Sequence, residues 1–201
     1  MGSVGALLLT AGESTRMGDL KALLPWQGAS LLSYQVSTLQ QAGINPIVVV
    51  LGHRAQELES QLPTAPGIRQ VHNPNYLKGK TTSIKAGLNA LQPHEIDAVL
   101  VLNVDQPRTA TTIKSIVDEH HRHTPLITIP TYRDKGGHPV ILSSTLLDEL
   151  MGISEESLGL KAVVHKHRKE THFVEMDSDE VLLDLNLEED YRRAFEKFGA
   201  G

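Results

Sequence analysis

One stretch near the N-terminus combines small residues with two cations at a spacing suited to phosphate groups. Residues 10–21 follow an apolar run that ends in Leu9, and they read Thr-Ala-Gly-Glu-Ser-Thr-Arg-Met-Gly-Asp-Leu-Lys. Glycine lets backbone N–H groups approach phosphate oxygens that a side chain would keep away. Arg16 can form a forked contact with phosphate, and Lys21 supplies a point charge. The segment therefore predicts a phosphate-binding loop.

This loop differs from the common P-loop. The residue directly before Lys21 is not glycine, and the residue directly after it is not Ser or Thr. Two glycines alone would also fit an ordinary connection between a strand and a loop with solvated charges. The prediction of a phosphate site therefore depends on the whole string of residues.

A carboxylate follows a second apolar run. Residues 103–107 read Asn-Val-Asp-Gln-Pro and come directly after Ala98–Leu102. In a doubly wound sheet the carboxyl ends of the strands form the ligand-binding edge, so Asp105 is expected beside the glycine-bearing loop. A carboxylate there can hold Mg²⁺, which bridges phosphate oxygens. The alternative is that Asp105 only shapes the turn before Pro107.

The elements that must position these residues alternate along the first two thirds of the chain. Short β-branched runs predict buried parallel strands at Val4–Thr10, Ile47–Leu51 and Ala98–Leu102. Helical spacing is found at Leu31–Ala42, Arg54–Leu62, Thr81–Leu91 and Thr111–His121. This alternation predicts an α/β fold with a Rossmann-like, doubly wound and mostly parallel sheet.

The pattern is less regular after Ile129, where a small β-hairpin insertion is expected. A turn at Asp134–Gly137 would join strands at Leu126–Thr131 and Pro139–Leu142. The later elements expected are helices at Ser144–Met151, Leu158–Lys166 and Glu188–Phe198, short strands at His172–Glu175 and Val181–Leu183, and a disordered tail at Gly199–Gly201. No internal repeat is seen, and all 201 residues are expected to form one domain.

Composition excludes several classes of function. The 19 basic and 24 acidic residues give a net charge of −5, without the basic surplus of a nucleic-acid binder. The absence of cysteine excludes disulfides, thiolate metal sites and a thiol nucleophile. No signal-peptide pattern and no apolar run of about 20 residues is present, so we expect a cytoplasmic protein without a membrane partner.

The residues from Leu9 to Trp26 resemble the signature L-A-A-G-x-S-x-R-M-G-x-x-K-x-L-L-P-W of the MobA-like nucleotidyltransferase family. Ser14 and Pro25-Trp26 are closest to its molybdenum cofactor cytidylyltransferase branch. That family has the nucleotide-diphospho-sugar transferase type of Rossmann-like fold. It binds CTP or GTP with magnesium and couples a nucleoside monophosphate to a phosphorylated pterin.

The resemblance implies a specific set of site residues. Arg16, Lys21 and Asp105 would be catalytic, with Mg²⁺, or Mn²⁺ as an alternative, as the cofactor and CTP as the favoured nucleotide. The residues implied to contact the nucleotide are Leu9, Ala11, Gly12, Glu13, Ser14, Thr15, Arg16, Met17, Gly18, Lys21, Asn73, Ser83 and Asp105.

Asn73 and Ser83 belong to a segment that resembles the family pattern N-P-x-W-x-x-G-x-x-x-S, which approaches the base and ribose. Tyr76 stands where Trp is usual. Capping of a helix by Thr81 or Thr82 is the alternative explanation of this segment.

Two later segments resemble the family's metal and acceptor sides. Leu183–Tyr191 resembles D-I-D/N-T-P-E-D-Y, which makes Asn186 the expected second metal ligand, with Asp184 on the same face of a strand. The alternative is that one of them caps the last helix. Gly137, His138 and Pro139 match a G-H-P segment that faces the second substrate, although His138 could equally pack as an ordinary side chain.

The acceptor is expected to be of the molybdopterin type, in a monomer that contacts molybdoenzymes or cofactor chaperones. However, Gly152–Lys161 lacks the aspartate of the family's G-D-x-G-A segment. A sugar phosphate or another phosphorylated metabolite is therefore an alternative acceptor, and a nucleotide- or cofactor-binding protein without turnover is an alternative function. An oxidoreductase has little support because G-x-G-x-x-G is absent.

The four residues His120–His123 also have the composition of a metal cluster. Adjacent residues on a helix point apart, and the sequence shows no partner for them. We interpret them as the polar end of a helix, where positive charge is favoured.

Overall fold

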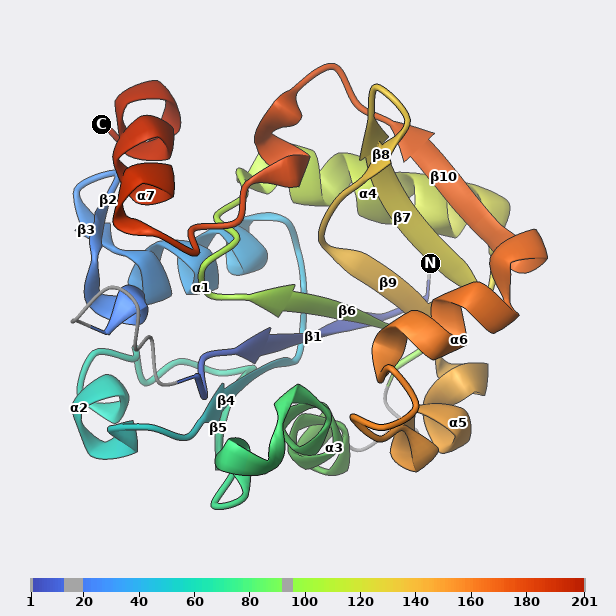
Figure 1. The fold of residues 1–201 in the computed structure, drawn as a ribbon, viewed down its shortest axis with the longest axis horizontal. Coiled ribbons are helices and arrows are strands. Elements are labelled where there is room, and N and C mark those ends of the chain that lie inside the picture. The colour runs from blue at the N-terminus through green and yellow to red at the C-terminus, as the bar shows by residue number, and fades with distance from the viewer. Residues whose placement is uncertain (1, 13–19, 92–95, 201) are drawn as a thin grey trace.

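A computed structural model describes residues 2–12, 20–91 and 96–200, and a twisted sheet forms its middle layer (Figure 1). The strand order is β10-β7-β9-β6-β1-β4-β5, and β8 pairs with β7. The strands are β1 Val4–Leu9, β4 Ile47–Leu51, β5 Ile68–His72, β6 Ala98–Asn103, β7 Ile127–Tyr132, β8 Lys135–Gly136, β9 Val140–Ser143 and β10 Thr171–Glu175. Strands β6, β1, β4 and β5 are parallel neighbours, whereas β9 runs antiparallel to both β6 and β7. The predicted mostly parallel α/β sheet with a hairpin insertion is confirmed.

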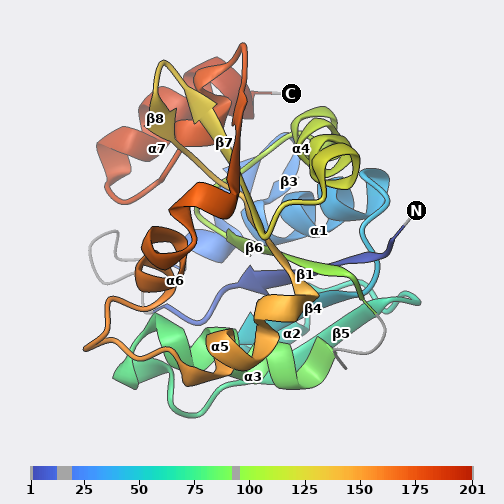
Figure 2. The ribbon, with the colours of Figure 1, turned by 90° about the vertical axis from the view of Figure 1, so that its right-hand side faces the viewer.

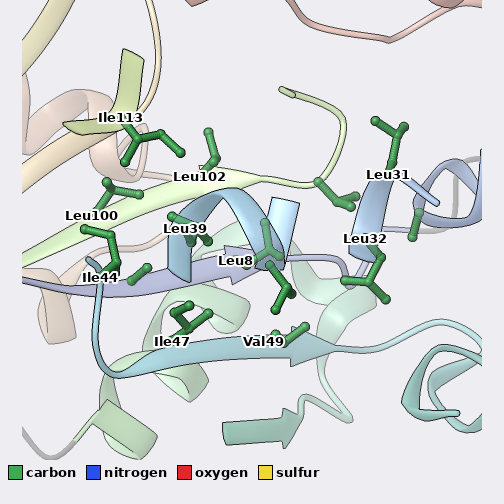
Figure 3. Close-up of a cluster of buried hydrophobic side chains, with 14 of the residues drawn as sticks. Leu8, Leu31, Leu32, Leu39, Ile44, Ile47, Val49, Leu100, Leu102 and Ile113 are labelled. Atoms are coloured by element: carbon green, nitrogen blue, oxygen red, sulfur yellow. The ribbon is translucent and has the colours of Figure 1, made fainter. Parts of the chain in front are cut away.

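Strand β1 shows why the sheet lies between two layers of helices. Its side chains alternate, so Ala6 and Leu8 join one apolar cluster while Leu7 and Leu9 join the other. Figure 3 shows Leu8 in the first cluster, together with side chains of the neighbouring strands and of α1 and α4. A strand that is apolar on both sides can be buried only if helices cover both faces.

The helices divide between these two faces (Figures 1 and 2). Helices α1 (Leu31–Gln41) and α4 (Ala110–His123) cover one face, and α3 (Lys80–Leu91), α5 (Leu147–Gly152) and α6 (Leu160–Lys166) cover the other. The short helix α2 spans Ala55–Glu59, which is shorter than the predicted Arg54–Leu62. No helix in the described ranges is both long and apolar enough to cross a membrane.

The C-terminal helix packs against the small hairpin of β2 (Pro25–Trp26) and β3 (Ala29–Ser30). Helix α7 (Glu188–Ala194) continues into a π-helix at Phe195–Gly199. The Gly199 carbonyl accepts a hydrogen bond of 2.7 Å from the backbone N–H of Gln27, and Gly199 is buried. The expectation that Gly199–Gly201 forms a disordered tail is therefore wrong for Gly199, because that residue packs against Trp26.

Two other sequence predictions need correction, and one strand was missed. Val181–Leu183 is no strand, because Asp179–Leu182 forms a 3₁₀ helix in which the Val181 carbonyl accepts a hydrogen bond from the buried Arg108. Strand β5 was not predicted, since its sequence IRQVH is only partly apolar, as suits a strand at the sheet edge. The hairpin reverses at Arg133 and Asp134, with φ of 49° and 64°, one residue earlier than expected.

Candidate functional site

The carboxyl ends of β1 and β6 place two of the predicted segments next to each other. Leu9 pairs with Asn103 in the sheet, and the backbone N–H of Val104 donates a 3.0 Å hydrogen bond to the Leu9 carbonyl. The beginning of the loop, Ala11–Gly12, and the turn that carries Asp105 therefore leave the same edge. The remaining loop residues of the prediction, namely Glu13, Ser14, Thr15, Arg16, Met17 and Gly18, lie outside the described residues.

Lys21 joins two predicted ligands from distant parts of the chain. Its Nζ lies 2.9 Å from Oδ2 of Asp105 and donates a 3.3 Å hydrogen bond to Oδ1 of Asn186. Lys21 stands in the 3₁₀ helix Lys21–Leu23, and its side chain is only 11% exposed against 20% for Asp105. Low exposure reduces screening by water, so this pair is a stronger electrostatic unit than a surface salt bridge.

Asp184 and Asn186 are held beside Asp105 by the backbone between them. The N–H of Leu185 donates a 2.9 Å hydrogen bond to the Asp105 carbonyl, and the Leu185 side chain is buried. Its two neighbours, Asp184 and Asn186, reach the surface, and Asp184 is only partly covered there. Burial and the charge of Asp105 raise the pKa of Asp184 above its ordinary value, although a hydrogen bond from Asn186 and the charges of Lys21 and Lys80 oppose this.

These side chains fit a hard divalent cation. Asp105 and Asp184 offer carboxylate oxygens and Asn186 offers an amide oxygen, which are the donors that Mg²⁺ and Mn²⁺ prefer. Burial and then the charge of Asp105 raise the pKa of Asp184, and a bound cation would favour its charged form against both. The alternative role as helix caps is wrong, because Leu187 is the N-cap of α7 and its N–H donates to Asp190 at 3.1 Å.

The predicted acceptor segment lies against the same part of the chain. Gly137 is buried, and a Cβ on it would collide with the carbonyl of Val181, which explains the glycine. His138 donates its N–H to that carbonyl at 2.9 Å, and a cis peptide bond joins His138 to Pro139. Burial, followed by the charges of Arg108 and Lys80, lowers the pKa of His138 to about 4. Its imidazole is therefore neutral near pH 7 and brings no positive charge to an acceptor.

Asn73 and Ser83 are buried and bonded to each other at the beginning of α3. The amide nitrogen of Asn73 donates 2.9 Å hydrogen bonds to the hydroxyls of Thr82 and Ser83, and its oxygen accepts from the N–H of Asn75. The first turn of α3 is capped from elsewhere, since Oε1 of Glu155 accepts from the N–H of Thr81 at 2.7 Å. The contact of Asn73 and Ser83 with a nucleotide stays a prediction.

A comparison with known families matches residues 6–171 to the MobA-like NTP transferase domain. The chain belongs to this family. The glycine-bearing loop and the aspartate turn both lie within the matched region. The resemblance inferred from the sequence is therefore confirmed.

Two curated relatives carry different names. The chain is 25% identical over 199 residues to the molybdenum cofactor cytidylyltransferase of Escherichia coli K12, which covers 98% of both chains. It is 31% identical over 152 residues to the nicotine blue oxidoreductase of Paenarthrobacter nicotinovorans, covering 71% of this chain and 72% of that one. Membership of the family thus does not by itself fix the substrate.

Solved structures share the fold over almost the whole chain. Rv0371c from Mycobacterium tuberculosis H37Rv superposes with a TM-score of 0.83 at 25% identity, covering 96% of this chain and 98% of that one. The same protein has been solved in complex with manganese, and that structure has a TM-score of 0.77 over the same shares of both chains.

Lys80 is a charged residue at this MobA-like site that sequence reasoning missed. It is the first residue of α3, and burial lowers its pKa while the charges of Asp105, Asp184 and Glu155 raise it. Its side chain reaches solvent but is partly covered, and the negative charges of Asp105, Asp184 and Glu155 act on it. A positive charge at a helix N-terminus interacts unfavourably with the helix dipole. Lys80 at the beginning of α3 is such a charge, and this unusual position could have indicated a functional role from the sequence.

Arg108 is the second residue that the sequence did not reveal. It is fully buried, and burial lowers its pKa to about 10 against the charges of Glu180, Asp184 and Asp105. Within the described part of the chain its guanidinium donates to four carbonyl oxygens. These belong to Pro107 at 2.7 Å, His138 and Val181 at 2.8 Å each, and Leu183 at 3.0 Å. Arg108 therefore ties the acceptor segment and the segment before Asp184 to the turn that carries Asp105.

Proposed function

We propose that this chain transfers a nucleotidyl group from a nucleoside triphosphate, with CTP favoured, to a phosphorylated acceptor of the molybdopterin type. Pyrophosphate is the second product. The observation that carries the proposal is the contact of the Lys21 ammonium with both Asp105 and Asn186, at the edge where Ala11–Gly12 leaves β1.

In the proposed reaction an oxygen of the acceptor phosphate attacks the α-phosphorus, and the bond from that phosphorus to the pyrophosphate oxygen breaks. A phosphate acceptor is already ionised near neutral pH, so the chain needs to supply no general base. The work of the protein is to position both substrates and to stabilise negative charge. Lys21 and Lys80 supply positive charge at the carboxyl edge, together with Arg16 of the loop.

Asp105, Asp184 and Asn186 would hold the divalent cation. When bound, Mg²⁺ or Mn²⁺ supplies positive charge that offsets the charge developing on phosphate oxygens. The manganese complex of Rv0371c supports the use of such a cation.

The segment Gly152–Lys161, which includes Glu155, lacks the aspartate of the family's G-D-x-G-A motif on the acceptor side. A sugar phosphate is therefore a competing acceptor, and binding without turnover is a competing function. The nicotine blue oxidoreductase relative adds a redox reaction as a further candidate.

The experiment is pyrophosphate release with each of the four nucleoside triphosphates, with and without molybdopterin. We expect release with CTP that depends on molybdopterin. Release only with a sugar phosphate would reject the pterin acceptor, and no release with any acceptor would reject transfer altogether. A parallel reaction with NADH or NADPH and nicotine blue tests the redox candidate.

A further inference from the structure

Three side chains far from the nucleotide-binding edge converge between α4 and β10. Oε2 of Glu119 lies 3.3 Å from Nε2 of His123 and 3.4 Å from Nε2 of His172. The two imidazole rings are stacked, with centroids 4.1 Å apart and planes 29° apart. One ligand atom from each residue lies within 4.8 Å of the other two.

The fold explains this convergence. Glu119 and His123 are four residues apart on α4 and therefore share one face of the helix. His172 is the second residue of β10, which lies along α4 at the end of the sheet (Figure 1). The absence of a partner for the histidines, inferred from the sequence, is thus wrong for His123, because its partners come from the preceding turn and from a distant strand.

A neighbouring residue orients the carboxylate. Nη1 of Arg122 forms an ion pair with Oε1 of Glu119, which leaves Oε2 for the two imidazoles. Glu119 and His172 have side chains that are 22% and 28% exposed, so the group is partly shielded from water while His123 is 47% exposed.

The two distances fit ligands that share a metal, and they also fit weak hydrogen bonds, of which the 3.4 Å contact of His172 with Glu119 is one. Charge-assisted hydrogen bonds between nitrogen and oxygen are usually about 2.7–2.9 Å long, so contacts of 3.3 Å and 3.4 Å are long for direct bonds. In a tetrahedral zinc site, bonds of about 2.0–2.2 Å place neighbouring ligands roughly 3.3–3.6 Å apart. Two imidazoles and one carboxylate are also ligands that suit Zn²⁺ far better than Mg²⁺.

We propose that Glu119, His123 and His172 form a binding site for Zn²⁺ or a similar first-row divalent metal. The site leaves the fourth tetrahedral position to a non-protein ligand. His123 and His172 also line an open hollow of about 440 Å³, so these two residues are accessible from solvent. The bound metal ties the edge strand β10 to α4, and so stabilises the folded chain in proportion to its occupancy.

The test uses the full-length chain, with Zn²⁺ alone as the probe and excess Mg²⁺ present to occupy oxygen-ligand sites. Competition with a chromophoric chelator gives stoichiometry and affinity, and ¹⁵N NMR reports on the imidazole nitrogens. We expect one tight equivalent, a rise in melting temperature, and zinc-dependent shifts of the His123 and His172 nitrogens. His123→Ala and His172→Ala should each weaken binding by at least about tenfold.

Two variants serve as controls. His165→Ala removes an exposed histidine of α6, and Asp105→Asn alters the carboxyl edge, and both should keep the zinc affinity of the unaltered chain. Zinc binding that is unchanged in the double variant His123→Ala/His172→Ala would overturn the proposal. Equally, imidazole signals of the unaltered chain that do not move at millimolar zinc would overturn it without any variant. Neither histidine belongs to the nucleotidyl-transfer machinery, so pyrophosphate release should stay unchanged in both single variants.

Discussion

Lys21 and Asp105 form a mostly buried ion pair, with 2.9 Å between Nζ and Oδ2, although 84 residues separate them along the chain. The ammonium also contacts the amide oxygen of Asn186 at 3.3 Å. In the protein without ligand, the lysine therefore neutralises the carboxylate that we assign to the metal. A metal that binds Asp105 must compete with Lys21, which then becomes available to a phosphate group.

This competition predicts opposite effects of Lys21→Met on binding and on activity. Loss of the ammonium should tighten Mn²⁺ binding, because Asp105 no longer has a competing cation, while transfer activity falls roughly 10²–10³-fold. Electron paramagnetic resonance measures free Mn²⁺, and pyrophosphate release measures activity. Lys114→Met, which removes an exposed lysine of α4, is the matched control. Weaker Mn²⁺ binding in Lys21→Met would contradict the competition.

Asp184→Asn should weaken the binding of the metal without lowering the stability of the folded protein. The raised pKa of Asp184 means that its charged form is disfavoured in the folded protein, mainly by burial and by Asp105. A neutral amide removes this penalty, so without metal the melting temperature at pH 7 should stay level or rise slightly. At the same time, the Mg²⁺ concentration for half-maximal activity should increase. An unaltered Mg²⁺ dependence would remove Asp184 from the proposed ligands.

Arg108→Met should be strongly destabilising. The substitution preserves apolar volume but removes the guanidinium donor from four carbonyl groups, of which that of Val181 still accepts from the N–H of His138. We expect a cost of about 3 kcal/mol or more in the free energy of unfolding. Urea denaturation measures this loss. Arg192→Met on the exposed face of α7 is the control and should change stability by less than about 0.5 kcal/mol. Near-equal stabilities of the two variants would refute the role of Arg108 as a tie between segments.

His120 predicts a loss of stability in acid. The residue is 6% exposed, and its Nδ1 lies 2.8 Å from the hydroxyl oxygen of Thr128, to which it is hydrogen-bonded. Burial, followed by the charges of His121 and His172, lowers the pKa of His120 from 6.5 to about 4. Between these two values the unfolded chain binds a proton that the folded chain does not, so stability falls as pH decreases from 6.5 towards 4. From pH 7 to pH 5 the loss should be about 2 kcal/mol.

Denaturation at the two pH values measures this slope. His120→Gln should remove about that much of the pH dependence, whereas His165→Gln at an exposed position should leave it intact. His138 has a similarly lowered pKa and adds a loss in the same direction, so some acid sensitivity persists in His120→Gln. An identical slope in His120→Gln and the unaltered chain would show that His120 is not buried in its neutral form.

The sequence predicted the centre of the molecule better than its periphery. The continuous apolar runs of β1 and β6 could only be strands buried on both faces, and their polar ends indicated the edge at which Lys21 and Asp105 meet. Strand β5 was missed, because an edge strand with polar residues lacks that pattern. The conformation of Val181–Leu183 was also predicted wrongly. The carbonyl groups of Val181 and Leu183 accept hydrogen bonds from Arg108 and not from a neighbouring strand.

The sequence also did not predict the roles of side chains that depend on tertiary contacts. Arg108 follows the aspartate turn in sequence, but three of its four carbonyl partners come from His138 and from the segment before Asp184. The meeting of His123 with His172 depends on how β10 lies along α4, and no local pattern encodes that arrangement.

Asp105→Ala provides the most direct test of the proposed transfer reaction. Nucleoside triphosphate binding should persist, because the loop and Lys21 supply most of its contacts in the proposed complex. Pyrophosphate release should fall roughly 10²–10³-fold or more, since the cation loses its central ligand. Release at the rate of the unaltered chain would contradict the assignment of Asp105 and, with it, the proposed site.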